Sequence, residues 1–333
     1  MPWWGWTADP FPLTGPRWAT DDGQDSDVGP PVIQTLNDLQ GTSAGAQLAM
    51  VLALMSAIAH AVFGALQKGR HDPWIVRAAI DLAMLAISAP VALFLVPWPQ
   101  GWDWLMMAGV VVIHFAYKLN MALAYERAAY TVVYPVARGS GALATVALAS
   151  LALHEHFAPL QWLGVLLLSG AIIGLARANL RGASVGRATL RSGMAWALAG
   201  GAMVAAYTTY DAWAIRRMPD PFAFLAWFFF LTAFDFPLLA LWRHLNRVGR
   251  PLPADLKPVM MRGLIGALVA LVSFGGVMLG TRLARVGEVA SLRETSTVFA
   301  ALIGWAFLGE KVGPVRALLM GGIALGAVLV QAG

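Results

Sequence analysis

Long apolar stretches of about 20 residues, separated by short polar turns, fill most of this sequence. A helix of that length can cross the hydrocarbon core of a bilayer. Hydrophobic residues make up 59% of the chain and charged residues only 12%, whereas soluble domains carry about 25% charged residues. The sequence therefore predicts an all-α integral membrane protein with ten transmembrane helices, at residues 48–68, 73–97, 104–125, 131–153, 158–177, 193–215, 221–242, 259–281, 287–308 and 314–332.

The two halves of the chain repeat each other. At one constant spacing Arg138 aligns with Arg293 and Glu155 with Glu310, and at a slightly shorter spacing Asp72-Pro73 aligns with Asp220-Pro221. Because each copy holds an odd number of helices, the second copy must be upside down in the bilayer, as in many transporters. We expect two inverted five-helix repeats at residues 47–178 and 193–333, a linker at 179–192, and a disordered, Pro- and Asp-rich tail at 1–46.

Basic residues are unevenly distributed among the loops. Most follow the odd-numbered helices, as Arg177, Arg181, Arg187 and Arg191 do, whereas only Arg216, Arg217, Arg282 and Arg285 follow even-numbered helices. The positive-inside rule then places the odd-numbered loops in the cytoplasm and both termini outside. We expect a multi-pass protein of the cytoplasmic (inner) membrane.

Several function classes find no support in the sequence. It contains no cysteine, Walker loop, HExxH motif or metal-ligand cluster. Its net charge of +5 comes from short loops between apolar stretches. We expect no enzyme activity, cofactor, metal or nucleic-acid partner. The expected partners are a small-molecule substrate, membrane lipid and coupling protons, with the chain as a monomer or homodimer.

Ionisable residues inside the expected helices cost about 2.5–3.5 kcal/mol each to insert, so they indicate a partner, a hydrated cavity or a function. Arg138 shares a helix face with Tyr134 and could bind a carboxylate or phosphate; the alternative is that it snorkels to the interface. Arg293 and Glu294 are adjacent and point about 100° apart, so each should face a different partner. Glu294 could carry a coupling proton. The alternative is a structural ion pair, such as Asp211 with Arg293.

Further candidates come from three other helices. Asp211 lies among aromatic residues, including Tyr207, and suits a cationic or amino group on a ligand or an arginine of a neighbouring helix. His114 and Lys118 could line the same cavity, although Lys118 could instead snorkel. His60 could form a polar core pair with Gln67. Asp81 and Asp235 are candidates for structural roles. The predicted substrate-binding residues are His60, His114, Tyr117, Tyr134, Arg138, Tyr207, Asp211, Arg293 and Glu294.

Three segments, VVYPVARGSGAL (132–143), TTYDAW (208–213) and SLRETSTVFAALIG (291–304), carry a family resemblance, as do the turns at His154-Glu155 and Gly309-Glu310. The chain resembles the EamA family of the drug/metabolite transporter superfamily, in its small-molecule permease branch. This resemblance implies a central cavity that Tyr134, Arg138, Asp211, Arg293 and Glu294 line or support. Phe63-Gly64 departs from the branch pattern. Family members are drawn with both termini in the cytoplasm, opposite to the charge count.

The resemblance implies a secondary transporter, a permease or exporter that moves a small polar or amphipathic metabolite by alternating access. Two alternatives stay open. A lipid or lipid-carrier flippase would have a groove open sideways to lipid and lined by Arg138 or Arg293. A non-transporting membrane scaffold would keep its function when the buried charges are neutralised.

Overall fold

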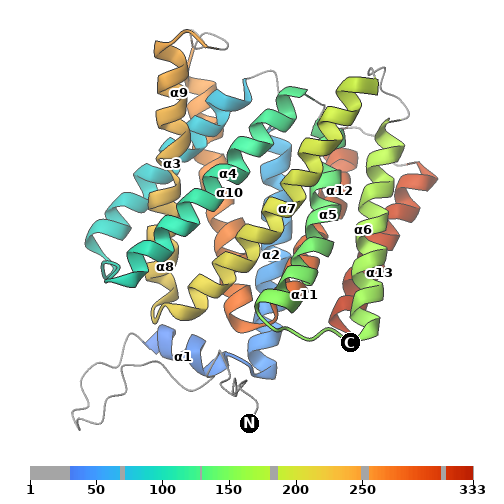
Figure 1. Ribbon diagram of the computed structural model, residues 1–333, viewed down its shortest axis with the longest axis horizontal. Helices are drawn as coiled ribbons and strands as arrows, with labels where there is room; N and C mark the ends of the chain where they lie inside the picture. Colours follow the sequence, from blue (N-terminus) through green and yellow to red (C-terminus); the bar gives the residue numbers. More distant parts are fainter. Residues whose placement is uncertain are drawn as a thin grey trace, which may run out of the picture.

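The computed structural model describes residues 31–67, 72–127, 130–180, 187–248, 255–308 and 313–332, and the regular structure in these ranges is entirely α-helical (Figure 1). The first half contains α1 (Pro31–Leu39), α2 (Ser43–Gln67), α3 (Pro73–Phe94), α4 (Trp102–Arg127), α5 (Tyr130–Ala152) and α6 (Pro159–Leu180). The second half contains α7 (Arg187–Arg217), α8 (Pro221–Thr232), α9 (Asp235–Leu245), α10 (Lys257–Leu283), α11 (Val286–Arg293), α12 (Ser296–Leu308) and α13 (Pro314–Gln331).

Matching caps begin the second apolar segment of each half. Asp72 accepts a hydrogen bond from the backbone N–H of Trp74, and Pro73 follows it as the first residue of α3. Asp220 does the same for Phe222 before α8. An aspartate cap satisfies a free helix-end donor, and proline has no N–H to leave unpaired there. The Asp-Pro pairs that align in the sequence are therefore equivalent helix starts.

Every one of the ten expected segments is helical, but two of them are interrupted. The expected helix at 221–242 is divided into α8 and α9, and the one at 287–308 into α11 and α12. The first break lies at Ala233, four residues before Pro237, whose ring clashes with that carbonyl in a continuous helix. These segments are thus not the unbroken helices that the apolar pattern predicted.

Part of the expected N-terminal tail is also helical. Residues 31–39 form α1, and α2 begins at Ser43, before the expected end of the tail at 46. Helix α1 lies across the end of the bundle where α2 begins, and Asn37 accepts a hydrogen bond of 2.7 Å from Arg282. Residues 1–30 and 181–186, which include most of the expected tail and part of the linker, lie outside the described residues.

Six helices are long and apolar enough to cross a membrane, by length and composition, with α8 and α9 counted as one. These spans are Ser43–Gly64, Trp74–Phe94, Trp102–Glu126, Pro221–Leu245, Lys257–Leu283 and Pro314–Gln331. Helices α5 and α6 contain shorter apolar stretches. Many large apolar side chains face outward, among them Leu105, Leu166, Leu241, Leu268 and Leu318, and apolar exposure on this scale marks a surface that contacts lipid.

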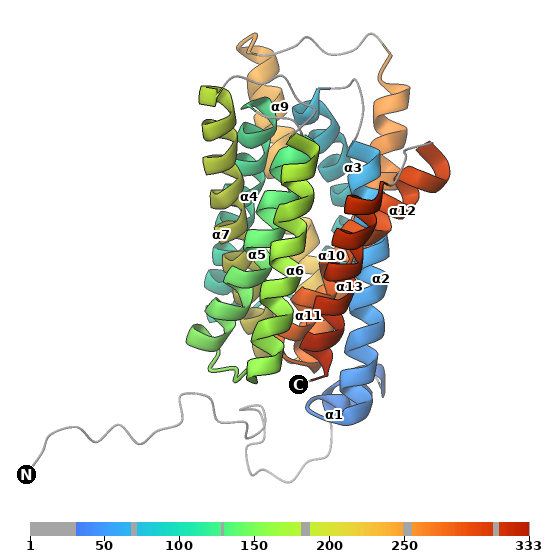
Figure 2. The same ribbon diagram turned by 90° about the vertical axis from the view of Figure 1, so that its right-hand side faces the viewer.

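The helices form one bundle in which the two halves interleave (Figures 1 and 2). Helix α7 packs on α5 and α4, α10 packs on α2 and α3, and α13 packs on α6. The α6–α13 contact is close because Gly164 and Gly326 face each other. A Cβ built on Gly326 would lie 2.6 Å from the carbonyl oxygen of Gly164. Small residues at such crossings let helix backbones approach in membrane proteins.

Candidate functional site

The centre of the bundle holds a buried ion pair between the two halves. Arg138, in the middle of α5, places Nη2 2.6 Å from Oε1 of Glu294, at the break between α11 and α12. Each residue is only 2% exposed. Arg138 therefore does not snorkel to the interface. Because both side chains are shielded from bulk water, the electrostatic attraction between them is stronger than between the same charges on a surface.

Arg293, next to Glu294, reaches the opposite side of the cluster. Its Nη2 lies 3.4 Å from Nδ1 of His60 on α2, and its guanidinium stacks 4.9 Å from the ring centre of Phe274 on α10. Because a guanidinium can only donate, Nδ1 of His60 must accept. Ser273, whose Oγ lies 3.2 Å from the same nitrogen, then donates to it as well. His60 is therefore neutral in this arrangement, with its proton on Nε2.

A third polar pair links α4 to α7. Nε2 of His114 lies 2.8 Å from Oδ2 of Asp211, and both side chains are buried. The ring of Tyr207 lies 4.8 Å from that of His114 and 4.9 Å from that of Tyr117. Phe228 covers the other side of His114, also at 4.8 Å. The Asp211 carboxylate thus sits among aromatic rings, but its partner is a histidine.

All nine predicted binding residues fall in or beside this cluster. The ring of His60 stacks on that of Tyr134, with 6.1 Å between the ring centres. The ring centre of Phe274 lies 6.4 Å from those of His114 and Tyr207. These ring contacts connect the three polar pairs.

One of the suggested pairings differs from the structure, and another involves a side chain that the structure does not describe. Arg293 forms no ion pair with Asp211, whose Oδ2 is held by His114. His60 contacts Ser273 and Arg293, while the side chain of Gln67 lies outside the described residues.

Several buried polar atoms of the cluster have no hydrogen-bond partner among the described residues. They are Nε and Nη1 of Arg138, the hydroxyls of Tyr207 and Ser291, Oδ1 of Asp211, Nε of Arg293 and Oε2 of Glu294. A buried polar atom without a partner costs about 1–3 kcal/mol, so native proteins keep few of them. So many in one place indicate that a polar ligand or water completes the site.

Lys118 belongs to a separate cluster. Its Nζ lies 2.9 Å from a carboxylate oxygen of Asp81 on α3 and 2.9 Å from one of Asp235 on α9. It also donates to the carbonyl of Thr232, one residue before the break between α8 and α9. Lys118 is buried, so it neither snorkels nor lines the central cluster. Lys118 therefore joins the two halves and binds a carbonyl that the break leaves without a helical partner. Asp81 and Asp235, which hold Lys118 in place, have the structural role expected of them.

The opposite end of the bundle has its own link between the halves. Glu155, in the turn after α5, accepts hydrogen bonds from Nη2 of Arg216 at 3.1 Å and from the backbone N–H of Val286 at 2.9 Å. The latter is a free donor at the start of α11, where a carboxylate is stabilised by the helix dipole. In the sequence Glu155 stood out only as a repeated turn residue, and its cross-half partners could not be inferred from it.

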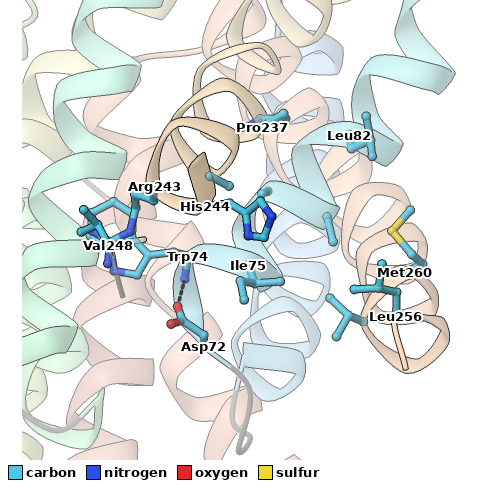
Figure 3. Close-up of a pocket in the computed structure, with 14 residues that line it drawn as sticks. Asp72, Trp74, Ile75, Leu82, Pro237, Arg243, His244, Val248, Leu256 and Met260 are labelled. Carbon is cyan, nitrogen blue, oxygen red and sulfur yellow. Dashed lines mark hydrogen bonds between the residues drawn. The ribbon is translucent and has the colours of Figure 1, made fainter. Parts of the chain in front are cut away.

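A cleft of about 200 Å³ opens between α3, α9 and α10, outside the central cluster (Figure 3). Its walls include Ile75, Leu82 and Met260, and at one end Arg243 stacks on Trp74 at 4.2 Å. Neither Arg138 nor Arg293 lines it. It therefore differs from the lateral groove that the flippase alternative predicted.

Ser273 and Phe274 were missed by the sequence analysis. Ser273 is a single hydroxyl in the apolar stretch LVSFGGV, a pattern that could have marked it as buried and paired. Phe274 gives no such signal. Among the described residues, no group of three His, Cys, Asp or Glu side chains could hold a metal ion.

Comparison with known proteins agrees with this architecture. A search of curated proteins found no significant sequence match. A crystal structure with 17% sequence identity superposes with a TM-score of 0.70, covering 87% of this chain and 98% of the other; identity this low shows a shared fold alone. Residues 191–332 match the EamA-like transporter family. The chain is a multi-pass membrane protein, and its second half is similar to transporters of the drug/metabolite type through this match to the EamA-like family.

Proposed function

We propose that this protein is a secondary transporter that moves a small polar or amphipathic metabolite across the cytoplasmic membrane by alternating access. The observation that carries the proposal is the central cluster, because both halves of the chain build it. His60, His114 and Arg138 come from the first half, and Asp211 and Glu294 from the second. Transporters built from repeats place their substrate site at such an interface.

The helix contacts support ten spans arranged as two inverted repeats, residues 47–178 and 193–333. If α8–α9 and α11–α12 each count as one span, the fifth spans pack on each other, α6 on α13, and the second spans do so as well, α3 on α8. Each remaining contact has a counterpart in which the equivalent helices of the two halves change places. The fourth span of one half packs on the first span of the other, as α5 on α7 and α12 on α2. The third span of one half also packs on the first span of the other, as α4 on α7 and α10 on α2. Such exchange is expected of two copies related by a twofold axis in the membrane plane.

Ion pairs join the halves at both ends of the central cluster. Lys118 binds Asp235 towards one end, and Arg216 binds Glu155 at the other. Rocking of one repeat against the other would break one pair while the other stays intact. The two links therefore support a cycle in which the site opens to one side of the membrane at a time.

Glu294 is our candidate for the proton-coupling group. It lies at the break between α11 and α12, and only one of its oxygens is paired among the described residues. Protonation of Glu294 would release Arg138 for a substrate, so one site would bind proton and substrate in turn. Such intramembrane carboxylates commonly carry protons in transporters.

The test is transport in proteoliposomes, using solutes that raise the unfolding temperature of the purified protein. We expect flux in the wild type that responds to an imposed pH gradient. The double variant Arg138→Gln/Glu294→Gln removes both charges without leaving either unpaired, so it should fold but carry no flux. Wild-type flux in this folded variant would rule out the proposed site.

A further inference from the structure

The two arginines and two carboxylates of the central cluster are unevenly paired. Arg138 contacts Glu294, whereas Asp211 contacts His114 through Oδ2. Arg293 forms no ion pair with a carboxylate of the described residues, and its contacts include His60 and the face of Phe274. A direct anionic partner would stabilise this buried cation.

The unpaired polar atoms of the cluster include three guanidinium N–H groups. Arg138 has Nε and Nη1 free and Arg293 has Nε free among the described residues. Two guanidinium groups with unused N–H donors match the oxygens of a carboxylate or phosphoryl group. One oxygen of Asp211 and one of Glu294 are also unpaired among these residues, so a donor group elsewhere on the ligand is compatible with the site.

The remainder of the cluster is aromatic. Phe274 lies beneath Arg293, and Tyr207, Tyr117 and His114 form a contiguous set of rings beside it. Gly275, the next residue on α10, is buried, yet a Cβ built on it would have no neighbour within 4 Å. There is therefore room for at least a methyl group at this position of α10. The aromatic rings themselves suit an apolar or aromatic part of a ligand.

We propose that the ligand of this site is an organic oxyanion, with a carboxylate or phosphoryl group bound between Arg138 and Arg293 and an apolar or aromatic body packed on the rings. This inference rests on the proposed function, because it names the substrate class of the same site.

The test is thermal unfolding of the full-length protein with four probes that share one phenethyl skeleton. Hydrocinnamate and phenethylphosphonate carry an oxyanion, hydrocinnamamide is neutral, and phenethylamine is a cation. At saturating concentrations the two anions should raise the unfolding temperature by about 3 °C or more. The amide and the amine should not, because they present no oxyanion to the two guanidinium groups.

Arg293→Gln is the informative variant, because Arg293 has no carboxylate partner to leave unpaired. We expect it to fold and to bind hydrocinnamate about 10- to 100-fold more weakly. Arg217→Gln, which changes an exposed arginine at one end of the bundle, should bind like the wild type. The assignment is overturned if phenethylamine stabilises the protein more than hydrocinnamate, if neither anion stabilises it, or if Arg293→Gln binds normally.

These outcomes are separate from those of the transport test, because binding requires no flux. Binding of the amine together with flux that is lost in Arg138→Gln/Glu294→Gln would leave the transporter standing and remove the anion assignment. Binding of the anions without any flux would support the anion assignment and contradict the transport proposal.

Discussion

Replacement of Arg138 by glutamine tests whether the central ion pair is as buried as the structure indicates. Glu294 would keep its charge at 2% exposure and lose the guanidinium 2.6 Å away. Removing one partner of a buried pair costs about 3–5 kcal/mol, mostly because the other charge is left without compensation. At about 2 °C per kcal/mol for a large chain, Arg138→Gln should lower the unfolding temperature by about 6–10 °C.

The double variant Arg138→Gln/Glu294→Gln gives the control. It removes the stranded charge and nearly conserves volume, so its stability should return to within about 1–2 kcal/mol of the wild type. Reversible unfolding in detergent micelles measures all the variants, and the double-mutant cycle gives the coupling energy. A coupling below about 1 kcal/mol, or a double variant as unstable as Arg138→Gln, would show that the two charges are solvated separately.

Three other predictions follow from the fold. The native chain has no cysteine, so Lys257→Cys and Arg217→Cys can report the orientation of the protein in the membrane. In intact cells a membrane-impermeant maleimide should label only Arg217→Cys, because the positive-inside rule places Lys257 in the cytoplasm. Labelling of Lys257→Cys alone would show the opposite orientation. Gly326→Ala forces the backbones of α6 and α13 apart and should lower the free energy of unfolding by about 1–3 kcal/mol. Gly321→Ala, whose new Cβ would have nothing within 4 Å, should be neutral or stabilising in the same unfolding assay. Equal effects of the two variants would refute the close crossing. Lys118→Met leaves Asp235 without its cation and leaves Asp81 with Arg77 alone, and it should cost about 3–5 kcal/mol. Lys257→Met at the surface should change stability by less than about 0.5 kcal/mol. A similarly small effect of Lys118→Met would mean that its cluster is hydrated.

Much of the helix layout could be predicted from local signals in the sequence. Apolar length located the helices, and the Asp-Pro pairs at 72–73 and 220–221 marked two helix starts through capping chemistry. Pro237 is also a local signal for the break between α8 and α9, because its ring clashes with the carbonyl four residues before it. The break at Glu294-Thr295 gave no comparable signal, since neither Pro nor Gly occurs there. Thr295 bonds its hydroxyl to the carbonyl of Leu292 instead, and such local bonds compete with helix continuation only in some contexts.

Candidate site residues could be found from the sequence, but their partners could not. The cost of an ionisable group in the membrane pointed to Arg138, Asp211, Arg293 and Glu294. Which of them pair depends on contacts between helices far apart in the sequence, such as α2 with α11. The pairing of Asp211 on α7 with His114 on α4 is another such contact, and no local pattern shows it.

The central claim is that this buried cluster becomes a hydrated path during the transport cycle. Ser291 tests it most directly, because its side chain is fully buried, unpaired among the described residues, and two residues from Arg293. Ser291→Cys in proteoliposomes should react with a small water-soluble thiol reagent, and hydrocinnamate should slow the reaction. Ser88→Cys, equally enclosed on α3 but outside the cluster, should stay unreactive. If Ser291→Cys is as inert as Ser88→Cys, water does not reach the cluster and the account of transport is wrong.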